Sequence, residues 1–358
     1  MATVRSIRLW RLSLPLAEPY RISQHVYERF EPFVSEVALA DGRTAWGEAG
    51  ITPGLTHETP QQARNWLIEI APRLIGASIE AGLVTIESAM PGHAHAASIL
   101  AAPLEVLAAD RAVHLDAAAT VPILAPLNGR DETGLAAEIE ARLAEGFKTL
   151  KVKVGFDVER DLFRVALIQR LVRGRAALRL DANQGFGRED AVRFATRLDP
   201  TGVELFEQPC HMDDWQANAA VAAVSPVPVM LDEAVKDEAD IDRAAQIPGV
   251  GYVKLKLKKI GGARCVRRAL DRIRDHGLEP VLGDGSATDI GNWLEAAVAR
   301  LTVSNAGEMN GFLKLKDPLL AEPLIFRDGA IHLPAGGQPA VALSRVETLS
   351  SWRASFSK

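Results

Sequence analysis

The chain has 358 residues, of which 47% are hydrophobic and 24% are charged, a composition typical of a globular protein with two domains or with one barrel and an added unit. The formal net charge is −5 and no long run of like charge occurs, so binding of nucleic acid or of an anionic membrane surface has no electrostatic basis. No apolar stretch reaches the roughly 18 residues of a membrane span, and the N-terminal segment alternates apolar and polar residues instead of forming a signal peptide.

The first 118 residues predict an α+β unit. Strand-like sequences, VRSIRLWRLSL and FVSEVALADGRTAWGEA, are followed by helical segments. After residue 318 the sequence LIFRDGAIHLPAG is hairpin-like, and we expect it to pack back onto the first unit. We therefore predict a discontinuous capping domain, residues 1–118 with 319–358, and a catalytic domain of residues 119–318.

From about residue 120 onward, β-prone runs alternate with helical segments at a nearly constant spacing. The runs are 122–127, 149–155, 178–183, 203–209, 227–234, 252–259, 279–285 and 305–311. Strand and helix repeated in this way are typical of a parallel sheet, and eight repeats predict an α/β fold closed into a (β/α)8 TIM-type barrel. An open doubly wound sheet is the alternative, but no Gly-x-Gly-x-x-Gly turn follows the first strand.

Three consecutive predicted strands end in carboxylates. Asp181 ends the third strand, Glu207 the fourth, and Asp232 the fifth, where Glu233 follows it. In a parallel barrel the carboxyl ends of the strands form one face, so these side chains should converge there. Because unpaired carboxylates at close range repel one another, a divalent cation with a preference for oxygen ligands, such as Mg²⁺, would stabilise the cluster. Each acid taken alone could instead be a helix cap or a solvated loop residue.

Lysines occur on the strands that flank these acids. The second strand carries Lys151 and Lys153, and the sixth run carries Lys254, Lys256 and a further pair at 258–259. Lysine is rare inside a barrel unless a partner or a function requires it. Strict alternation would put 254, 256 and 258 on one face, but it does not say which of them reaches the site. A lysine close to a divalent cation loses its proton more readily and can act as a base.

Six short motifs together resemble the enolase superfamily, and within it the muconate-cycloisomerase-like subgroup of mandelate racemase and muconate lactonizing enzymes. The motifs are KVKVG, LRLDANQGF, FEQP, LDEA, KLKLKKIGG and WGEA, and their order and spacing match across essentially the whole chain. The resemblance implies a modified, (β/α)7β-like TIM-type barrel with an α+β capping domain that the C-terminal tail completes. It also implies that Asp181, Glu207 and Asp232 bind Mg²⁺, with Mn²⁺ as a substitute.

The resemblance further implies the catalytic residues. Lys153, the second lysine of the Lys-x-Lys motif, and Lys256, five residues before the Gly-Gly pair, would be the two acid–base groups. Supporting roles fall to Lys151, beside Lys153, and to Asn183 and Glu233, which would orient groups around the metal.

The chemistry so implied is Mg²⁺-dependent removal of a proton α to a substrate carboxylate through an enediolate intermediate. We expect an isomerase, a racemase or epimerase that acts on an amino-acid derivative such as an N-acyl amino acid, a dipeptide or a proline-type compound. A cycloisomerase or a dehydratase of the same superfamily is the alternative. Two readings from other classes are a non-catalytic metal-binding barrel and an aldolase-type barrel in which a lysine forms a Schiff base.

The last two predicted strands bear on the substrate. No histidine lies near the end of the seventh, so the two-lysine site is favoured over a His–Asp base, and the eighth carries Glu308 and Asn310 where related dipeptide epimerases carry two aspartates. Asp284 and Asp289 add carboxylates near the predicted barrel mouth. An acid-lined pocket suits a substrate with an amine beside its carboxylate, so we expect Asp284, Glu308 and Asn310 to bind substrate.

The remaining expectations concern the lid, the partners and the compartment. The segments 18–32 and 50–59, with Tyr20, His25, Tyr27 and His57 among their residues, are expected to close over the substrate. The expected partner is a small-molecule carboxylate, with neither nucleic acid nor membrane, and a homo-oligomer is expected. The only cysteines, Cys210 and Cys265, are far apart in sequence and are predicted to be thiols in a cytoplasmic protein.

Overall fold

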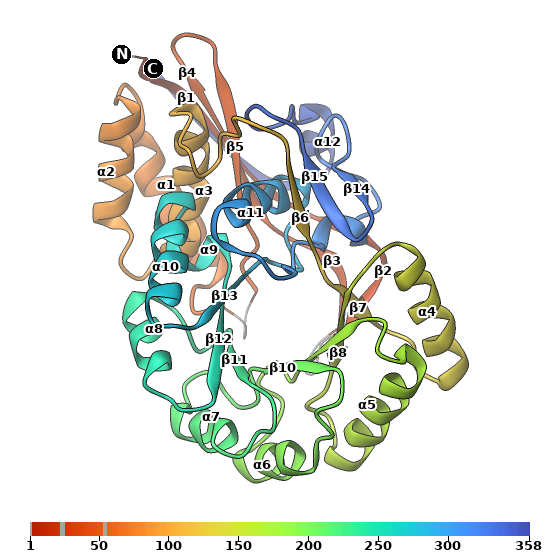
Figure 1. The fold of residues 1–358 in the computed structure, drawn as a ribbon. Helices are drawn as coiled ribbons and strands as arrows, with labels where there is room; N and C mark the ends of the chain where they lie inside the picture. Colours follow the sequence, from red (N-terminus) through yellow and green to blue (C-terminus); the bar gives the residue numbers. More distant parts are fainter. Residues whose placement is uncertain (1, 22–25, 53–55) are drawn as a thin grey trace.

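The computed structural model describes residues 2–21, 26–52 and 56–358, and it contains a small antiparallel unit beside a barrel (Figure 1). The predicted lid segments 18–32 and 50–59 are therefore described only in part, and His25 lies outside the described residues. Both chain termini lie together at the far edge of the small unit (Figure 1).

The small unit is a four-stranded antiparallel sheet covered by helices. In sheet order its strands are β16 (Ser350–Ser357), β1 (Val4–Leu12), β4 (Phe33–Leu39) and β5 (Thr44–Ala49). Its helices are α1 (Pro60–Leu74), α2 (Ile79–Ala89) and α3 (Ala94–Leu107). The C-terminal strand β16 pairs with β1, where Ile7 lies opposite Phe356. The tail therefore completes the N-terminal sheet, as the sequence predicted, whereas the boundaries at 118 and 319 stay predictions.

A hairpin reaches from this unit toward the barrel. It consists of β2 (Leu14–Arg21) and β3 (Val26–Phe30), and its side chains Leu16, Tyr20 and Phe30 form a small apolar cluster. The ring centroids of Tyr20 and Phe30 are 6.3 Å apart in an edge-to-face contact, a geometry that aromatic pairs favour. The hairpin thus presents Tyr20 to the mouth of the barrel.

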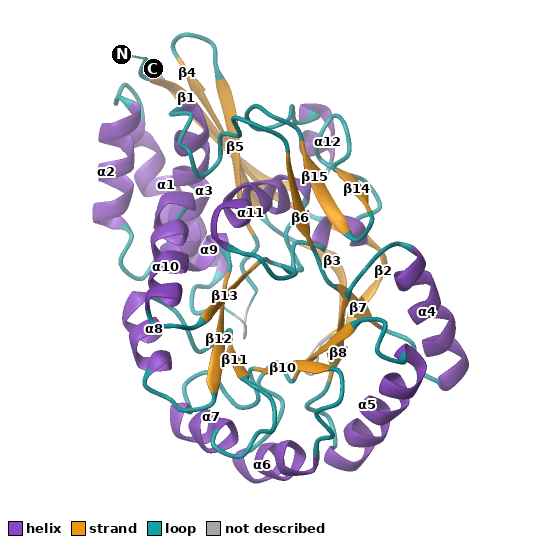
Figure 2. Ribbon diagram, viewed as in Figure 1, coloured by secondary structure: helices purple, strands orange, loops and turns teal. Residues whose placement is uncertain are grey.

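The second unit is a parallel barrel with its helices outside (Figure 2). Among the described residues, seven strands follow one another in chain order: β7 (Ala125–Leu127), β8 (Thr149–Lys153), β9 (Ala177–Asp181), β10 (Val203–Glu207), β11 (Val229–Leu231), β12 (Val250–Leu255) and β13 (Glu279–Leu282). The helices are α4 (Glu132–Ala144), α5 (Val158–Val172), α6 (Arg188–Arg197), α7 (Trp215–Ala222), α8 (Glu238–Ala245), α10 (Ala263–Asp275) and α11 (Asp289–Thr302). The predicted α/β barrel with a capping unit is confirmed.

The eighth predicted run closes the barrel without forming a regular strand. The Gly307 N–H donates to Pro122 O at 3.0 Å, and the Glu308 N–H donates to Leu282 O at 3.1 Å. The segment therefore bonds to both neighbours, but two glycines and two asparagines in NAGEMNG give it little strand propensity. The helix η1 (Gly311–Lys314), a 3-10 helix, follows directly.

The first predicted run, 122–127, is also interrupted. It divides into β6 (Ala119–Pro122) and β7, and β6 pairs outside the barrel in the order β14 (Ile325–Arg327), β15 (Ala330–Leu333), β6. Pro122 and Pro126 lack the N–H that a continuous ladder needs. The short helix α12 (Leu343–Thr348) leads on to β16.

The structure of the sixth run differs from the predicted strand with alternating lysines. Strand β12 ends at Leu255, Lys256 is the N-cap residue of α9 (Leu257–Ile260), and Gly261 ends this helix with φ 89°. The prediction that 254, 256 and 258 share one strand face is wrong beyond Leu255, because the strand ends there and residue 258 lies on the helix α9. Lys258 and Lys259 thus belong to α9.

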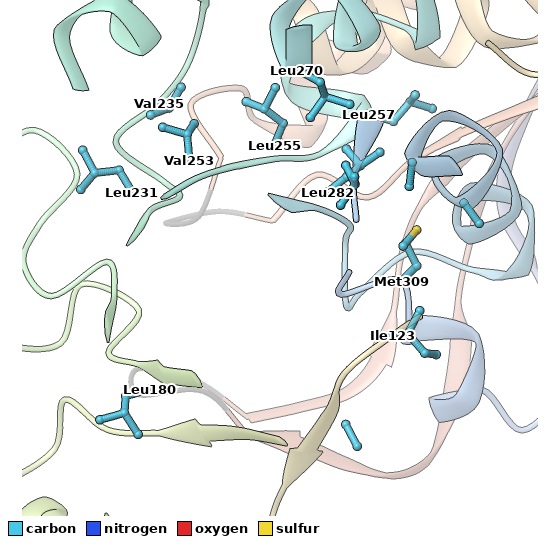
Figure 3. Packing of buried hydrophobic residues seen from close by; sticks show 14 of the residues in the cluster. Ile123, Leu180, Leu231, Val235, Val253, Leu255, Leu257, Leu270, Leu282 and Met309 are labelled. Carbon is cyan, nitrogen blue, oxygen red and sulfur yellow. The ribbon is translucent and has the colours of Figure 1, made fainter. Parts of the chain in front are cut away.

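The strands present apolar side chains to the helices and a mixture of charged and apolar side chains to the barrel interior. Leu180, Leu231 and Val253 belong to the large core cluster that the helices complete (Figure 3). Since side chains alternate along a strand, their neighbours Arg179, Asp181 and Lys254 point inward. Within the described residues, no helix is long and apolar enough to cross a lipid bilayer, and both cysteines are free thiols.

Candidate active site

A cavity lies at the carboxyl ends of the barrel strands. Its barrel side is lined by charged residues from β8, β12 and the loops after β11 and β13, with Asn183 from the loop after β9. Its other side is lined by Tyr20, Tyr27 and Phe30 of the hairpin, with His95 of α3. Burial lowers the pKa of His95 to about 3, with the positive charge of Lys258 nearby contributing, so this imidazole is neutral at pH 7. The cavity therefore lies where the two units meet.

The three predicted metal ligands lie on neighbouring strands. Asp181 ends β9 and Glu207 ends β10, and their Cα atoms are direct partners in the sheet, while Asp232 follows β11. All three side chains are buried. Gln208 supports the third, because its Oε1 accepts hydrogen bonds from the backbone N–H groups of Asp232 and Ala234 at 3.0 and 3.1 Å. Gln208 is the glutamine of the FEQP motif. The sequence motif indicates a role only for Glu207.

Two buried lysines lie among these acids. The Lys151 Nζ is 2.9 Å from both Asp181 Oδ2 and Glu207 Oε2 and 2.7 Å from Glu308 Oε2. The Lys254 Nζ is 3.0 Å from Glu207 Oε1 and 3.3 Å from Asp232 Oδ2, and it also pairs with Glu308. The ammonium groups thus offset the repulsion between the carboxylates. The sequence motifs assign no role to Lys254.

The two predicted acid–base lysines are more accessible and lie on opposite sides of the acids. Lys153, at the end of β8, places its Nζ 2.6 Å from Asp181 Oδ2 and 2.6 Å from Asn183 Oδ1. Lys256, just after β12, places its Nζ 2.9 Å from Asp232 Oδ2. Their side chains are 11% and 13% exposed, against 1% for Lys151 and 3% for Lys254. Lys153 and Lys256 therefore face the cavity.

Burial would lower the pKa of both accessible lysines, but the carboxylates outweigh it. Asp181 is the main group that holds the pKa of Lys153 above its usual value, and Asp232 has the same effect on Lys256. Burial, with the charge of Asp232 next to it, raises the pKa of the Glu233 carboxyl to about 7. Glu233 Oε1 accepts a hydrogen bond of 3.1 Å from Asn183 Nδ2, so the predicted supporting residues contact each other.

The acids expected to bind a substrate ammonium are engaged by lysines. Asp284 Oδ2 lies 2.5 Å from Lys258 Nζ, and Glu308 pairs with both Lys151 and Lys254. The Asn310 side chain donates to Leu124 O at 2.9 Å and accepts from the Lys314 Nζ at 2.7 Å. All three residues are buried, and of them Asp284 and Glu308 line the cavity, but their charges and hydrogen-bonding groups are occupied within the protein.

Asp289 does not lie at the barrel mouth, contrary to the expectation. It is buried in the first turn of α11 and accepts hydrogen bonds from the backbone N–H groups of Leu319 and Leu320 at 3.0 and 2.7 Å. The aspartate holds the segment after η1 against the barrel and has a structural role. Its position next to the helix cap Thr288 was the signal for this role.

The donor set fits a hard divalent cation. As the side chains stand in the described ranges, no three His, Cys, Asp or Glu side chains surround a common point, because lysine ammonium groups lie between the acids. However, Asp181, Glu207 and Asp232 offer only oxygen atoms, as Mg²⁺ prefers. The buried Glu207 Oε2 accepts no hydrogen bond of good geometry from the described residues, although the Lys151 Nζ lies 2.9 Å from it, so a bound cation would replace an ion pair there.

Comparison with known proteins identifies the relatives of this chain. Residues 134–338 match the family model described as "Enolase C-terminal domain-like". The L-Ala-D/L-Glu epimerase of Bacillus subtilis is 26% identical over 354 residues, which cover 93% of this chain and 94% of that protein. The muconate lactonizing enzyme of Pseudomonas fluorescens, solved with muconolactone, superimposes with a TM-score of 0.88 at 25% identity and covers 98% and 99% of the two chains.

A second solved structure has the same fold at lower identity. The dipeptide epimerase of Cytophaga hutchinsonii, solved with Mg and the dipeptide D-Ala-L-Val, superimposes with a TM-score of 0.88 at 21% identity, covering 99% of this chain and all of that one.

Proposed function

From the premise that this chain belongs to the enolase C-terminal domain-like family and is an isomerase of the enolase superfamily, we propose that it racemises or epimerises an amino-acid derivative. The proposed reaction moves a proton at the carbon next to a carboxylate. The observation that carries the proposal is the placement of Lys153 and Lys256, the accessible lysines on the two sides of the acid cluster. Two bases that face one carbon from opposite sides can remove a proton on one side and return one on the other.

Each lysine has a defined task in this reaction. The Nζ of one lysine, as the free amine, accepts the α-proton, and the Nζ of the other, as the ammonium, donates a proton to the opposite face. Asn183 orients Lys153 through its 2.6 Å contact. The hairpin residues Tyr20 and Phe30 limit access of water to the reacting carbon.

Asp181, Glu207 and Asp232 would hold the Mg²⁺ ion that the relatives suggest. A bound Mg²⁺ ion would polarise the substrate carboxylate and stabilise the negative charge that develops on it. Mg²⁺ suits this ligand set because all of its donors are oxygen atoms.

Cycloisomerisation is a second candidate. The similarity to the muconate lactonizing enzyme covers nearly the whole of both chains. This chain also has Glu308 and Asn310 where related dipeptide epimerases are expected to carry two aspartates. In a cycloisomerase, one lysine would donate a proton to a carbanion, and the other lysine would not exchange that proton. Product analysis separates the candidates, because only racemisation or epimerisation returns the starting constitution.

The proposal is tested by deuterium exchange. Wild-type protein with Mg²⁺ is incubated in D2O with N-acyl amino acids, dipeptides and proline derivatives, and exchange at the α-carbon is followed by ¹H NMR. We expect exchange with at least one class of compound. The double variant Lys153→Ala/Lys256→Ala should lose exchange by more than about 100-fold, since general acid–base groups contribute about 10²–10⁴ in rate. Absence of exchange with every compound, or full exchange by the double variant, would show the proposal to be wrong.

A further inference from the structure

The three acids that would bind Mg²⁺ are already in contact with more positive charge than they carry. Five lysines place their Nζ within 4.0 Å of an oxygen atom of Asp181, Glu207 or Asp232: Lys151, Lys153, Lys254, Lys256 and Lys259. A divalent cation that enters this cluster meets ammonium groups at close range, where like charges repel strongly. Binding of Mg²⁺ therefore favours movement of a lysine away from the ligand oxygens.

Lys254 differs from the other four lysines in its hydrogen bonds. Its Nζ donates to Glu207 Oε1 at 3.0 Å and also to Glu308, an acid outside the predicted ligand set. Among the described residues, none of the other four hydrogen-bonds both to a predicted ligand and to a carboxylate outside that set. Lys254 thus connects the ligand set with a second anionic partner.

The ammonium group of Lys254 lies between two of the ligand side chains. It is 3.0 Å from Glu207 Oε1 and 3.3 Å from Asp232 Oδ2, and all three side chains are almost fully buried. A Mg²⁺ ion needs its oxygen ligands at about 2.0–2.1 Å. An ion held by both residues would therefore compete with the ammonium group for their oxygen atoms.

Both acids keep a cation if Lys254 moves away. The Lys151 Nζ is 2.9 Å from Glu207 Oε2, and two further lysines contact Asp232. Lys254 in turn keeps its pair with Glu308, so no buried charge is left without a partner, which would be costly. The flexible four-carbon stem of lysine allows its Nζ to shift while the backbone of β12 stays in place.

We propose that Lys254 occupies the cation site of the unloaded protein and pairs with Glu308 alone when Mg²⁺ binds. Lys254 thereby lowers the affinity for Mg²⁺, and Glu308 raises it by receiving the ammonium group. The inference rests on the metal ligands named in the proposed function. It goes beyond that function because it gives Lys254 and Glu308 a role in metal loading.

Magnesium titration of two variants with opposite expected effects tests the proposal. MgCl₂ is titrated into metal-free protein by isothermal titration calorimetry. Lys254→Met should bind Mg²⁺ about tenfold or more tightly than wild type, because it removes a competing charge at close range. Glu308→Gln leaves Lys254 with only the ligand acids as carboxylate partners, so it should bind Mg²⁺ about tenfold or more weakly. Equal or weaker binding by Lys254→Met would overturn the proposal.

Two further variants separate displacement of Lys254 from a general effect of charge. Lys258 also lines the cavity, but among the described residues it pairs with Asp284 and with no predicted ligand, so Lys258→Met should change the Mg²⁺ affinity much less than Lys254→Met. In the double variant Lys254→Met/Glu308→Gln, the loss of Glu308 should weaken Mg²⁺ binding less than it does in wild type, since no ammonium group remains there to be received. Equal effects of the two lysine variants, or of Glu308→Gln in both backgrounds, would show the inference to be wrong.

Thermal unfolding gives a second readout. Lys254→Met takes a counterion from buried acids, so its melting temperature in EDTA should fall below that of wild type. The rise in melting temperature on addition of Mg²⁺ should be larger in the variant, because a ligand that binds the folded state more tightly stabilises it more. Lys254→Gln serves for both measurements if Lys254→Met does not fold. A rise no larger than that of wild type would contradict the proposal.

The outcome is separable from that of the proposed function. Metal affinity is measured without substrate, so tighter binding by Lys254→Met in a protein that exchanges no α-proton would support the role of Lys254 and contradict the proposed function. Exchange by the wild type, together with an unchanged Mg²⁺ affinity in Lys254→Met, would support the function and contradict the role of Lys254.

Discussion

At the scale of single residues, the site is a set of interleaved opposite charges. Lys151 and Lys254 are almost fully buried between the acids, whereas Lys153 and Lys256 reach the cavity surface. Burying a charged group without a partner costs several kcal/mol, so each carboxylate on the strand ends requires a cation nearby. The lysines meet that requirement in the metal-free protein, and the carboxylates would be shared with a metal ion in the loaded one.

The ligand assignment is tested by metal titration. We expect Asp181→Asn and Asp232→Asn to weaken Mg²⁺ binding, measured by calorimetry, by more than about tenfold, because each removes an anionic oxygen ligand. Asp284→Asn is the matched control, since Asp284 also lines the cavity but pairs with Lys258. Equal weakening by Asp284→Asn would contradict the assignment.

Much of the site could be predicted from the sequence, because the strand rhythm fixes which residues end neighbouring strands. Asp181, Glu207 and Asp232 are brought to one face in this way. The pairing of Asp284 with Lys258 could not be predicted, because Lys258 was assigned to a strand when it lies on α9.

At the scale of elements, two glutamates of the small unit cap helices of the barrel. Glu48 on β5 accepts hydrogen bonds from the N–H groups of Thr288 and Gly291, at 2.7 and 2.8 Å, at the start of α11. Glu105 on α3 accepts from the N–H groups of Ala263 and Arg264, at 2.8 and 2.9 Å, at the start of α10. Carboxylates stabilise helix N-termini, so these contacts fasten the capping unit to the barrel.

Removing one of these caps should destabilise the protein. We expect Glu48→Ala to lower the free energy of unfolding by about 3 kcal/mol, because it leaves buried N–H groups without acceptors. Urea denaturation measures the change. The exposed Glu69→Ala on α1 removes only a surface pair with Arg73 and should cost about 0.5 kcal/mol or less. Similar costs for both variants would contradict the structural role of Glu48.

The contribution of Glu48 to the free energy of unfolding depends on pH with a definite sign. Burial raises the pKa of Glu48 from an ordinary value of 4.5 to about 7. Between these pH values the folded protein binds more protons at Glu48 than the unfolded chain does, so its stability falls as pH rises. The difference in stability between wild type and Glu48→Ala should therefore shrink from about pH 5 to pH 7 and then level off. A difference that grows over this range would contradict the assignment.

The elements themselves were predicted with three exceptions. The repeated strands and helices follow from hydrophobic periodicity, and so does the α+β unit. The end of β12, the division of the first run and the irregular eighth run were predicted incorrectly. The sixth run enters α9 directly after Leu255, prolines interrupt the first run, and glycines and asparagines weaken the eighth. Gly261 has a positive φ that turns the chain after α9, and a sequence pattern of alternating lysines resembles a strand until the backbone geometry is known.

At the scale of the whole molecule, the site exists only where the two units meet. The barrel supplies the acids and lysines, and the hairpin supplies Tyr20, whose ring lies 5.9 Å from Lys153 Nζ and 4.4 Å from Lys314 Nζ. β16 completes the sheet from which the hairpin extends, so the last residues of the chain support a wall of the cavity. The cavity thus takes its lining residues from both units of one chain.

The central claim is that Lys153 and Lys256 act on opposite faces of one carbon. The most direct measurement is the rate of α-proton exchange in D2O of each stereoisomer of a substrate, for wild type and for Lys153→Ala and Lys256→Ala separately. We predict that each variant loses exchange of one stereoisomer by more than about 100-fold and retains exchange of the other, with the two variants showing opposite preferences. Loss of the same stereoisomer's exchange in both variants, or loss in neither, would contradict the account.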